Sequence, residues 1–553
     1  MAANRRSRKR NNAGSVLNNQ LLLILVGVLS AVLVVLLVIS GSLLNSNLPE
    51  ASDNVLNNGS PSASQPSSSE TQPSSGVVPP NSSVPPYSSV PPSSIPTTTA
   101  PKLPVIPSGG NYINVGSGYI AEVIQVNVET FDGDTYDDFS HPTNNYLPKG
   151  TVDYCAKELA YGSGMKYVVL RSGHRVYYDK KVYPFGDGYS KMIEEVKQYS
   201  GTLPDHNEIG VASMEIVGHH TVLTLDTLWK APFYFETNQS GYSNPNAGKD
   251  RDYSIVSNNI SYVDITFCYA TVLEGTLSIP SDHPLFKSAE VIKNESDYTL
   301  RLHLRKKGGF YGWHAYYNDQ DQLCFQFLNP TKVTTAVNKY GADLTGAYIM
   351  IDVGHGGVDG GAAAMCCPTC DVIMMASELK SGKCPTCKTK AETYYSEAEL
   401  NLNLANALKA ELESIGATVV LNRTDNDTPI NVNERQEQLL AISPDVCIAI
   451  HQNSNDSKSI RGFYSYYYTP WSQLLAKNIY NYTKESGVYN RQFLQWKANY
   501  FMNRQTVCPT MLTENGFMSN ATDLADMADP EKVEIKASAI AQGIVDYFLK
   551  ISA

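Results

Sequence analysis

Residues 348–357 read Tyr348-Ile-Met-Ile-Asp352-Val-Gly-His355-Gly-Gly357. The apolar run at its start predicts a short buried strand, and an acid, a histidine and three glycines follow directly. In α/β layer folds, functional groups gather just beyond the carboxyl ends of parallel strands. This stretch therefore indicates both the fold class and the place where a functional site should lie.

The sequence after this stretch alternates between helix and strand patterns. Leucines at four-residue spacing predict an amphipathic helix over residues 397–415, which Gly416 ends. Strands alternating with helices predict a mostly parallel sheet flanked by helices for residues 346–553. The other helices are expected at 432–442, 471–485 and 531–549, and the other strands at 418–421, 446–450 and 510–513.

Polar residues stand at the ends of three predicted strands. His355 follows the first strand, His451 follows the strand at 446–450, and Glu514 follows the strand at 510–513. Because parallel strands end at the same edge of a sheet, we expect these three side chains to approach one another.

A fourth residue, Glu397, opens the first predicted helix. Ser396 and Glu399 form an S-x-x-E capping pattern that places Glu397 at the first helical position. Two histidines and one carboxylate are a known ligand set for catalytic zinc, with the fourth position left to water. We therefore predict that His355, Glu397 and His451 bind catalytic Zn²⁺. A carboxylate outside the ligand set must then carry the water's proton to the leaving amine, and Glu514 is the candidate.

Five ordered motifs between residues 347 and 549 resemble those of zinc-dependent N-acetylmuramoyl-L-alanine amidases (amidase type 3), which hydrolyse cell-wall peptidoglycan. The motifs are Asp352-Val-Gly-His355-Gly-Gly357, Glu397-Ala-Glu-Leu-Asn401-Leu402, Val420-Leu-Asn-Arg423, Ile450-His451-Gln-Asn453 and Leu512-Thr-Glu514-Asn-Gly516-Phe517-Met-Ser519-Asn520. The resemblance implies hydrolysis of the amide bond between N-acetylmuramic acid and L-alanine. It also implies that His355, Glu397 and His451 are the zinc ligands and that Glu514 is the catalytic glutamate.

The chain departs from the family pattern at two places. Val353 stands where the family usually has proline, which removes no ligand. The stretch between His355 and Glu397 is longer than the family leads us to expect, so Glu392 is a rival for the ligand position. Asn401 and Leu402 follow Glu397 at the family spacing, and this favours Glu397.

Two further residues receive weaker roles. Asp352, close to His355, is expected to orient that histidine as a partner outside the ligand set. Arg423 is a candidate for stabilising the oxyanion that forms during hydrolysis.

A cysteine-rich insertion, residues 362–391, interrupts the amidase-like region. Cys367-Pro-Thr-Cys370 and Cys384-Pro-Thr-Cys387 are paired C-x-x-C motifs, a spacing typical of structural zinc sites. Disulfides are the competing interpretation, because the predicted location is outside the cytoplasm. We predict a second, structural Zn²⁺ held by these four cysteines, beside the catalytic cleft.

The N-terminal part predicts attachment to a membrane. Residues 1–20 carry a basic cluster, and residues 21–44 contain an uncharged apolar run long enough to cross a bilayer as a helix. Residues 45–110 are rich in serine and proline and predict a disordered stalk. A cleaved signal peptide is the alternative to an anchor. In both cases we expect the residues after 45 to lie outside the membrane. If the helix is an uncleaved anchor, the chain is a single-pass protein of the cell membrane.

Residues 111–345 predict a β-rich region. Apolar and polar residues alternate over 300–305 and 323–327, as in half-buried strands. A break near Pro204 or His283 would divide the region into two subdomains. Most of its many aromatic residues are expected to pack within the sheets, and contact of exposed rings with wall sugars is the alternative.

The predicted partners are peptidoglycan and, through the N-terminal helix, the membrane. A formal net charge of −11 argues against nucleic-acid binding. The sequence identifies no regulatory partner. Two alternative functions stay open at this point, a zinc peptidase that cuts peptide bonds and a non-catalytic wall-binding protein.

Overall fold

The computed structural model describes residues 111–113, 119–131, 142–160, 165–239, 251–252, 257–367, 369–370, 372–375, 383–384, 386–390, 393–489 and 495–552. All of them belong to one compact unit, residues 94–553. The predicted basic N-terminus (1–20), membrane helix (21–44) and stalk (45–110) lie outside the described residues, so they stay predictions. No helix within the described residues is long and apolar enough to span a membrane.

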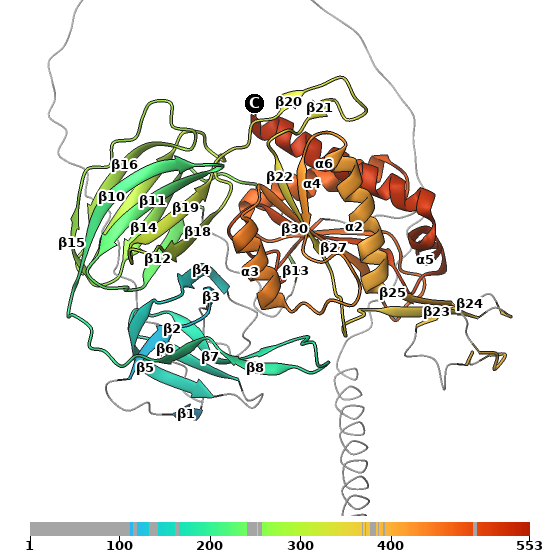
Figure 1. Ribbon diagram of the computed structural model, residues 1–553, viewed down its shortest axis with the longest axis horizontal. Coiled ribbons are helices and arrows are strands. Elements are labelled where there is room, and N and C mark those ends of the chain that lie inside the picture. The colour runs from blue at the N-terminus through green and yellow to red at the C-terminus, as the bar shows by residue number, and fades with distance from the viewer. Residues whose placement is uncertain are drawn as a thin grey trace, which may run out of the picture. The chain divides into compact units, whose positions relative to one another are not determined.

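A seven-stranded sheet forms the centre of the C-terminal domain (Figure 1). Its strand order is β13-β29-β28-β30-β27-β22-β26. The strands are β13 (Arg251–Asp252), β22 (Tyr348–Val353), β26 (Thr418–Leu421), β27 (Val446–Asn453), β28 (Phe463–Tyr467), β29 (Trp496–Ala498) and β30 (Thr510–Phe517). β26, β22, β27 and β30 are parallel neighbours, whereas β28 pairs antiparallel with β30. The mostly parallel sheet predicted from the sequence is confirmed.

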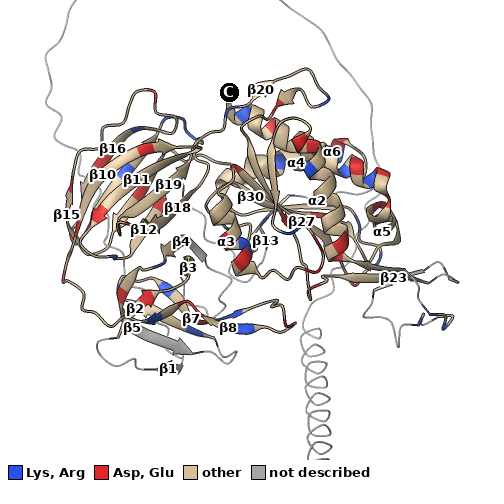
Figure 2. Cartoon of the chain, viewed as in Figure 1, with Lys and Arg blue, Asp and Glu red and all other residues tan. Residues whose placement is uncertain are grey.

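Five α-helices accompany this sheet among the described residues. They are α2 (Glu397–Glu413), α3 (Val432–Ile442), α4 (Gln473–Glu485), α5 (Ala521–Ala528) and α6 (Pro530–Ser552), with a 3₁₀ turn, η2 (Pro470–Ser472), before α4. The four helices predicted from periodicity are confirmed, and α5 was not predicted. Acidic and basic residues alternate along α6 (Figure 2), and all of them except the buried Lys536 are at least partly exposed.

Side chains on β22 alternate between the two faces of the sheet, as the period of a strand requires. Ile349 and Ile351 belong to the apolar core that contains residues of α2, α4 and α6. Met350, between them, belongs to a different core that contains Leu439 of α3 and residues of the preceding β region. The strand is therefore buried on both faces, which explains its continuous apolar sequence.

The first part of the middle region is a nine-stranded sheet with the path β4-β3-β7-β6-β5-β2-β9. β1 pairs with β5, and β8 pairs with β7. The strands are β1 (Asn111–Ile113), β2 (Ile120–Val123), β3 (Asn127–Phe131), β4 (Pro142–Pro148), β5 (Val152–Ala160), β6 (Lys166–Leu170), β7 (Arg175–Val182), β8 (Lys191–Glu194) and β9 (Val196–Gln198).

The second part consists of a five-stranded sheet, β15-β10-β11-β19-β18, and a four-stranded sheet, β12-β14-β17-β16, which share one apolar core. The strands are β10 (Asn207–Val217), β11 (His220–Thr227), β12 (Phe233–Thr237), β14 (Tyr262–Phe267), β15 (Ala270–Glu274), β16 (Phe286–Lys293), β17 (Tyr298–Leu304), β18 (Trp313–Tyr317) and β19 (Leu323–Leu328). Pro204 lies between the last strand of the first part and the first strand of the second, whereas His283 lies within the second part. The division into two subdomains stays a prediction. A small hairpin, β20 (Thr334–Thr335) and β21 (Ala342–Asp343), leads to β22.

The loop between β29 and β30 binds both parts of the middle region. Arg504 is buried and forms a two-point ion pair with Glu129 of β3, with Nη2 and Oε2 2.9 Å apart. Tyr146 of β4 donates its hydroxyl to the Arg504 carbonyl at 3.0 Å. The Trp313 N–H donates to the Thr506 carbonyl at 2.7 Å. Breaking a buried ion pair leaves an uncompensated charge, so these contacts fix the loop firmly.

The cysteine-rich insertion contributes a three-stranded antiparallel sheet, β24-β23-β25. Its strands are β23 (Ala363–Cys367), β24 (Val372–Met375) and β25 (Thr393–Ser396). β25 runs directly into α2. The insertion is therefore connected without a loop to the helix that begins with Glu397.

Candidate functional site

His355 lies just beyond the end of β22, in a loop whose backbone is held from several sides. Its φ of 59° is in the left-handed region, which non-glycine residues seldom adopt. Arg435 of α3 donates to the carbonyls of Val353 and His355, both at 2.8 Å. Asn401 of α2 donates to the Gly354 carbonyl at 3.1 Å. Buried donors that converge on this turn stabilise the strained conformation and aim the imidazole.

Glu397 is the first residue of α2 and is buried. The Ser396 side chain caps the helix by accepting a hydrogen bond from the Glu399 N–H, as the sequence predicted. One carboxylate oxygen, Oε1, lies 3.1 Å from His355 Nε2 and 3.0 Å from His451 Nδ1. The other oxygen accepts from the Ala362 N–H at 2.9 Å. Glu397 therefore stands between the two histidines with its carboxylate fixed in place.

Two glycines leave the space that these side chains occupy. A methyl group on Gly354 would lie 2.4 to 2.7 Å from ring atoms of His451. A methyl group on Gly361, where φ is +66°, would lie 2.6 Å from Glu397 Oε2 and 2.7 Å from His355 Cδ2. Only glycine fits at either position while the three side chains keep this arrangement.

His355, Glu397 and His451 form a group whose ligand atoms all lie within 4.8 Å of one another. Two imidazole nitrogens and a carboxylate oxygen about 3 Å apart suit one ion with bonds of about 2.0 to 2.2 Å. The histidine side chains keep 24% and 22% of their surface exposed, so a substrate can reach the group. The donor set and its partial exposure fit a catalytic zinc ion. Glu392, the rival ligand, lies outside the described residues.

Glu514 lies on β30 directly opposite His451 of β27 in the parallel register. Side chains of paired residues on neighbouring strands point to the same side of a sheet. Glu514 therefore shares the face of the sheet on which His451 meets Glu397, at the edge predicted from the sequence. It is not a member of the three-residue ligand group, which suits a proton carrier better than a ligand.

The carboxylate that orients His355 is Asp359, and this corrects the expectation for Asp352. His355 Nδ1 is 2.8 Å from Asp359 Oδ2, which leaves Nε2 directed at Glu397. Asp352 instead accepts from Arg435 and Asn422 in the buried interior. Asp352 lies on the α3 side of β22, and its contacts with Arg435 and Asn422 hold the end of this strand in place. No spacing rule singles out Asp359, four residues after His355 in an irregular turn.

The electrostatics of the group favour a cation among these side chains. Burial lowers the pKa of His355, but hydrogen bonds to Asp359 and Glu397 outweigh it and raise the pKa to about 10. Burial raises the pKa of Glu397, and hydrogen bonds from His355 and His451 outweigh it and hold the pKa well below its ordinary value. Two carboxylates thus concentrate negative charge at the rim of the sheet.

Arg423 has a different task from the predicted oxyanion stabilisation. Arginine has five N–H donors, and in Arg423 all are occupied. The acceptors are the carbonyls of Val353, Gly354, Ala398 and Asp425 and the side chain of Asn426. Arg423 is also buried, and burial followed by repulsion from Arg435 lowers its pKa to about 10. We assign it to holding the His355 loop against the start of α2.

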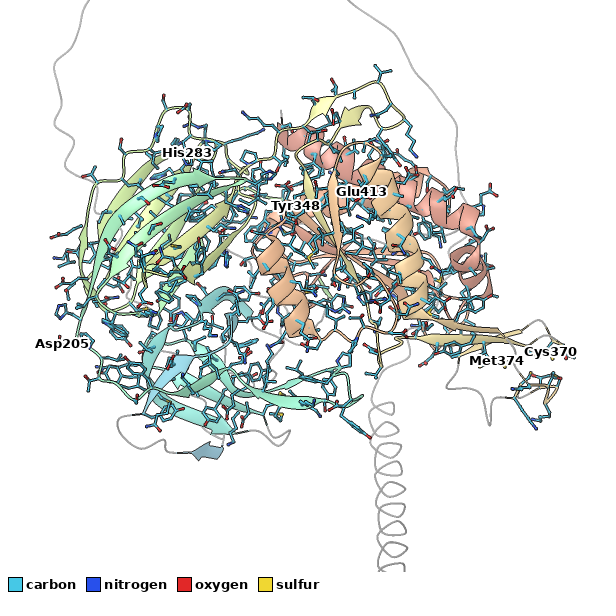
Figure 3. All side chains as sticks on the ribbon, viewed as in Figure 1. Asp205, His283, Tyr348, Cys370, Met374 and Glu413 are labelled. Carbon is cyan, nitrogen blue, oxygen red and sulfur yellow. The ribbon has the colours of Figure 1, made fainter. Side chains whose placement is uncertain are left out.

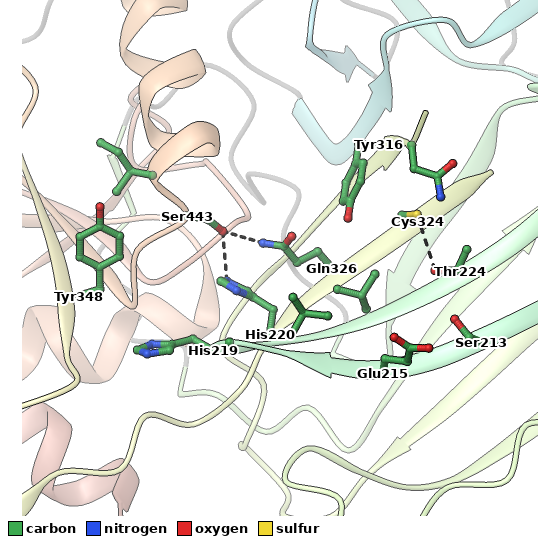
Figure 4. Close-up of a pocket in the computed structure, with 15 residues that line it drawn as sticks. Ser213, Glu215, His219, His220, Thr224, Tyr316, Cys324, Gln326, Tyr348 and Ser443 are labelled. Atoms are coloured by element: carbon green, nitrogen blue, oxygen red, sulfur yellow. Dashed lines mark hydrogen bonds between the residues drawn. The ribbon is translucent and has the colours of Figure 1, made fainter. Parts of the chain in front are cut away.

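A pocket of about 520 Å³ lies elsewhere, between β10, β11, β19 and the end of α3 (Figure 4). Tyr348, at the start of β22, lines it, whereas His355 follows the other end of that strand. Ser443 contacts His220 at 3.1 Å and accepts from Gln326 at 2.7 Å (Figure 4). The pocket is therefore separate from the candidate metal site.

The loop between β7 and β8 approaches the turn after His355. A methyl group on Gly186 would lie 3.2 Å from the Pro429 ring, and one on Gly357 would lie 2.5 Å from the Pro429 Cα. A methyl group on Gly188 would lie 4.0 Å from Val358. Part of the middle region thus reaches the rim of the site.

Residues 349–546 match the model of the N-acetylmuramoyl-L-alanine amidase family. Among curated proteins, N-acetylmuramoyl-L-alanine amidase LytC of Bacillus subtilis is 28% identical over 229 residues, which cover 40% of this chain and 39% of LytC. The probable cell wall amidase LytH of Staphylococcus aureus is 29% identical over 205 residues, which cover 37% of this chain and 60% of LytH. The match thus spans less than two thirds of either relative.

Solved structures of amidases also align with the chain. The catalytic domain of CwlV from Bacillus (Paenibacillus) polymyxa is 25% identical, with a TM-score of 0.30, 37% of this chain covered and 99% of that chain. An N-acetylmuramoyl-L-alanine amidase from Clostridium difficile is 23% identical, with a TM-score of 0.30, 36% of this chain covered and 96% of that chain.

Proposed function

We propose that residues 349–546, which match the model of the N-acetylmuramoyl-L-alanine amidase family, form an amidase domain and that the protein hydrolyses peptidoglycan. The bond cut is the amide between the lactyl group of N-acetylmuramic acid and L-alanine. The observation that carries the proposal is the convergence of His355, Glu397 and His451 beside Glu514 at one edge of the sheet.

The three residues of the ligand group would hold a zinc ion in this site. Zinc supplies Lewis-acid polarisation of the amide carbonyl and makes a coordinated water more acidic. Asp359 keeps the proton on His355 Nδ1, so Nε2 is available to the ion. Arg423, Arg435 and Asn401 hold the backbone that carries His355, so the ligand is oriented in advance.

Glu514 is the proton carrier in this proposal. Its carboxylate accepts the proton of the water that attacks the lactyl carbonyl and returns that proton to the nitrogen of L-alanine. The products are a carboxylate on the lactyl group and a free amino group on the peptide. A zinc peptidase would use the same residues but would leave its new carboxylate on an amino acid.

Digestion of purified peptidoglycan distinguishes these two reactions. We expect products identified by mass spectrometry to carry intact lactyl-muramic acid and peptides that begin with L-alanine. A chelator is expected to stop their release, and added zinc to restore it. New carboxylates found only on amino acids would contradict the amidase proposal, and unaltered wall after prolonged digestion with zinc would favour a binding protein.

We also propose that a loop of the middle region contacts the substrate. The β7–β8 loop near Pro429 carries Tyr183 and Tyr189, which are 52% and 74% exposed. Asp187 accepts from the Tyr189 N–H at 3.2 Å and pairs with Lys191 at 2.7 Å, so the loop has a defined turn. Exposed aromatic rings offer an apolar face and a polar edge, which suits a sugar chain.

Replacing Tyr189 with alanine is expected to raise KM for insoluble wall several-fold while leaving kcat nearly unchanged, since the ring would bind the substrate and transition state alike. Tyr189→Phe keeps the ring and serves as the matched control. Equal KM values for the unaltered chain and the alanine variant would remove this loop from the proposed contact surface.

A further inference from the structure

The four cysteines of the insertion come together in the fold. The sulfur atoms of Cys367, Cys370, Cys384 and Cys387 all lie within 4.8 Å of one another. Cys367 Sγ and Cys387 Sγ are 3.4 Å apart. A disulfide joins its sulfurs at about 2.05 Å, whereas four sulfurs bound tetrahedrally at about 2.3 Å from one ion stand roughly 3.8 Å apart. The spacing of the sulfurs fits a metal ion better than two disulfides.

The second cysteine pair lies in a tight backbone turn. The Cys384 N–H donates to the Thr389 carbonyl at 2.8 Å, and the Lys388 N–H donates to the Cys384 carbonyl at 2.9 Å. Lys388 has a φ of 64°, and Lys383 and Lys390 form an isolated bridge that closes the turn. This turn brings Cys384 and Cys387 to one side, where they face the other pair.

Among the residues that the structure describes, the tip of the insertion has almost no apolar core besides sulfur. Its buried cluster consists of Cys367, Met374 and Cys384, with Cys370 and Cys387 packed against it. Cys370 lies beyond the ends of β23 and β24 that are distant from α2 (Figure 3), and Met374 pairs with Met365 within the hairpin. Structures with so little core are usually stabilised by disulfides or a metal. The sulfur spacing selects the metal here.

The insertion continues directly into the candidate active site. β23 ends at Cys367, and its first residue, Ala363, pairs with Ser396, the residue that caps α2. At the base of the two strands, the Glu397 N–H donates to the Ala362 carbonyl at 2.8 Å. The Ala362 N–H in turn donates to Glu397 Oε2 at 2.9 Å. The pairing of β23 with β25 therefore determines where the Glu397 carboxylate points.

We propose that the four cysteines bind a zinc ion of their own, and that this ion sets the position of Glu397 through β23 and β25. By closing the tip, the ion holds the two strands in register. Glu397 is then presented to His355 and His451 in the geometry described above. The second part of this inference rests on the proposed amidase function, whereas the first part does not.

Metal content of the purified full-length chain tests the first part. We expect two zinc ions per unaltered chain by mass spectrometry of the elements. The Cys384→Ser variant and the His451→Ala variant should each hold one ion, and the double variant none. Cys155→Ser, which alters a cysteine of the middle region, should keep both. Cys387→His should also keep both, because histidine can replace a thiolate as a zinc ligand.

Hydrogen exchange tests the second part without using activity. In the Cys384→Ser variant we expect faster exchange of the backbone amides of β23 and β25, and unchanged exchange in β27 and β30. If the amidase proposal is right, kcat should fall about 10- to 100-fold in that variant, as when an outer partner of a metal ligand is lost. The Cys387→His variant should instead keep the slow exchange of β23 and β25 and the kcat of the unaltered chain.

Three results would overturn the inference. One zinc ion in the unaltered chain, lost from His451→Ala and kept by Cys384→Ser, would exclude the cysteine site. Peptide mapping that finds the four cysteines in disulfides would do the same. Unchanged exchange in β25 after loss of the second ion would exclude the link to Glu397. Failure to digest wall with both ions bound would instead contradict the proposed function and leave the cysteine site intact.

Discussion

The Glu514→Gln chain is expected to bind zinc like the unaltered chain and to cleave peptidoglycan roughly 10²- to 10⁴-fold more slowly. Glutamine keeps the size of the side chain at the position opposite His451 but cannot accept a proton from water. Because Glu514 lies outside the ligand group, metal content should not change. Turnover of soluble muropeptides and elemental analysis on the same sample measure both quantities.

Glu531→Gln is the matched control for this variant. Glu531 is an exposed glutamate at the start of α6, so its replacement should leave turnover within about twofold of the unaltered chain. Two outcomes contradict the role given to Glu514. One is turnover at the unaltered rate, and the other is loss of the metal ion together with activity, which would make Glu514 a ligand.

Replacing Glu397 with alanine is expected to remove the ion at the histidine site and to reduce amide hydrolysis to background. The variant loses the oxygen that lies 3.1 Å from His355 and 3.0 Å from His451. It also loses the acceptor for the Ala362 N–H. Zinc content and wall digestion, measured side by side, check the expectation.

Glu392→Ala decides between the two glutamates that the sequence left as rivals. We expect this variant to retain both the ion and the activity. Retention of zinc by Glu397→Ala together with its loss from Glu392→Ala would reverse the assignment. Loss of the zinc ion from both variants would show that Glu392 of the insertion also takes part in binding this ion.

The residues at the ends of strands were predictable because each had a local signal. β22, β27 and β30 are short apolar runs that end in a chemical group, and parallel strands bring such groups to one edge. α3 begins and ends where the sequence predicted, since Asn431 and Glu434 form a capping box and Ser443 adopts the left-handed conformation at its end. For these elements, local chemistry and tertiary packing agree.

The parts that could not be predicted depend on contacts between distant residues. Arg435 holds the His355 loop from α3, eighty residues further along the chain, and no spacing rule connects the two. The sequence predicts that Arg423 stabilises an oxyanion, but backbone carbonyls and the Asn426 side chain occupy all of its N–H donors. The antiparallel position of β28 likewise follows from its pairing with β30, which its sequence does not reveal.

The start of α5 has a local signal in the sequence. Asn520 caps this helix by accepting from the N–H groups of Thr522 and Asp523. Asn520 belongs to the motif that carries Glu514, and asparagine before a run with apolar spacing also indicates a helix start. The two roles are compatible, because the helix follows directly on the strand end.

Anomalous diffraction at the zinc absorption edge, from crystals of the protein grown with zinc, tests the central claim most directly. We predict a peak bonded to His355 Nε2, His451 Nδ1 and a carboxylate oxygen of Glu397, with Glu514 beside it and not bonded to it. A metal peak that has Glu392 in place of Glu397 would contradict the account. A metal peak at the four cysteines with none at His355, Glu397 and His451 would also contradict it.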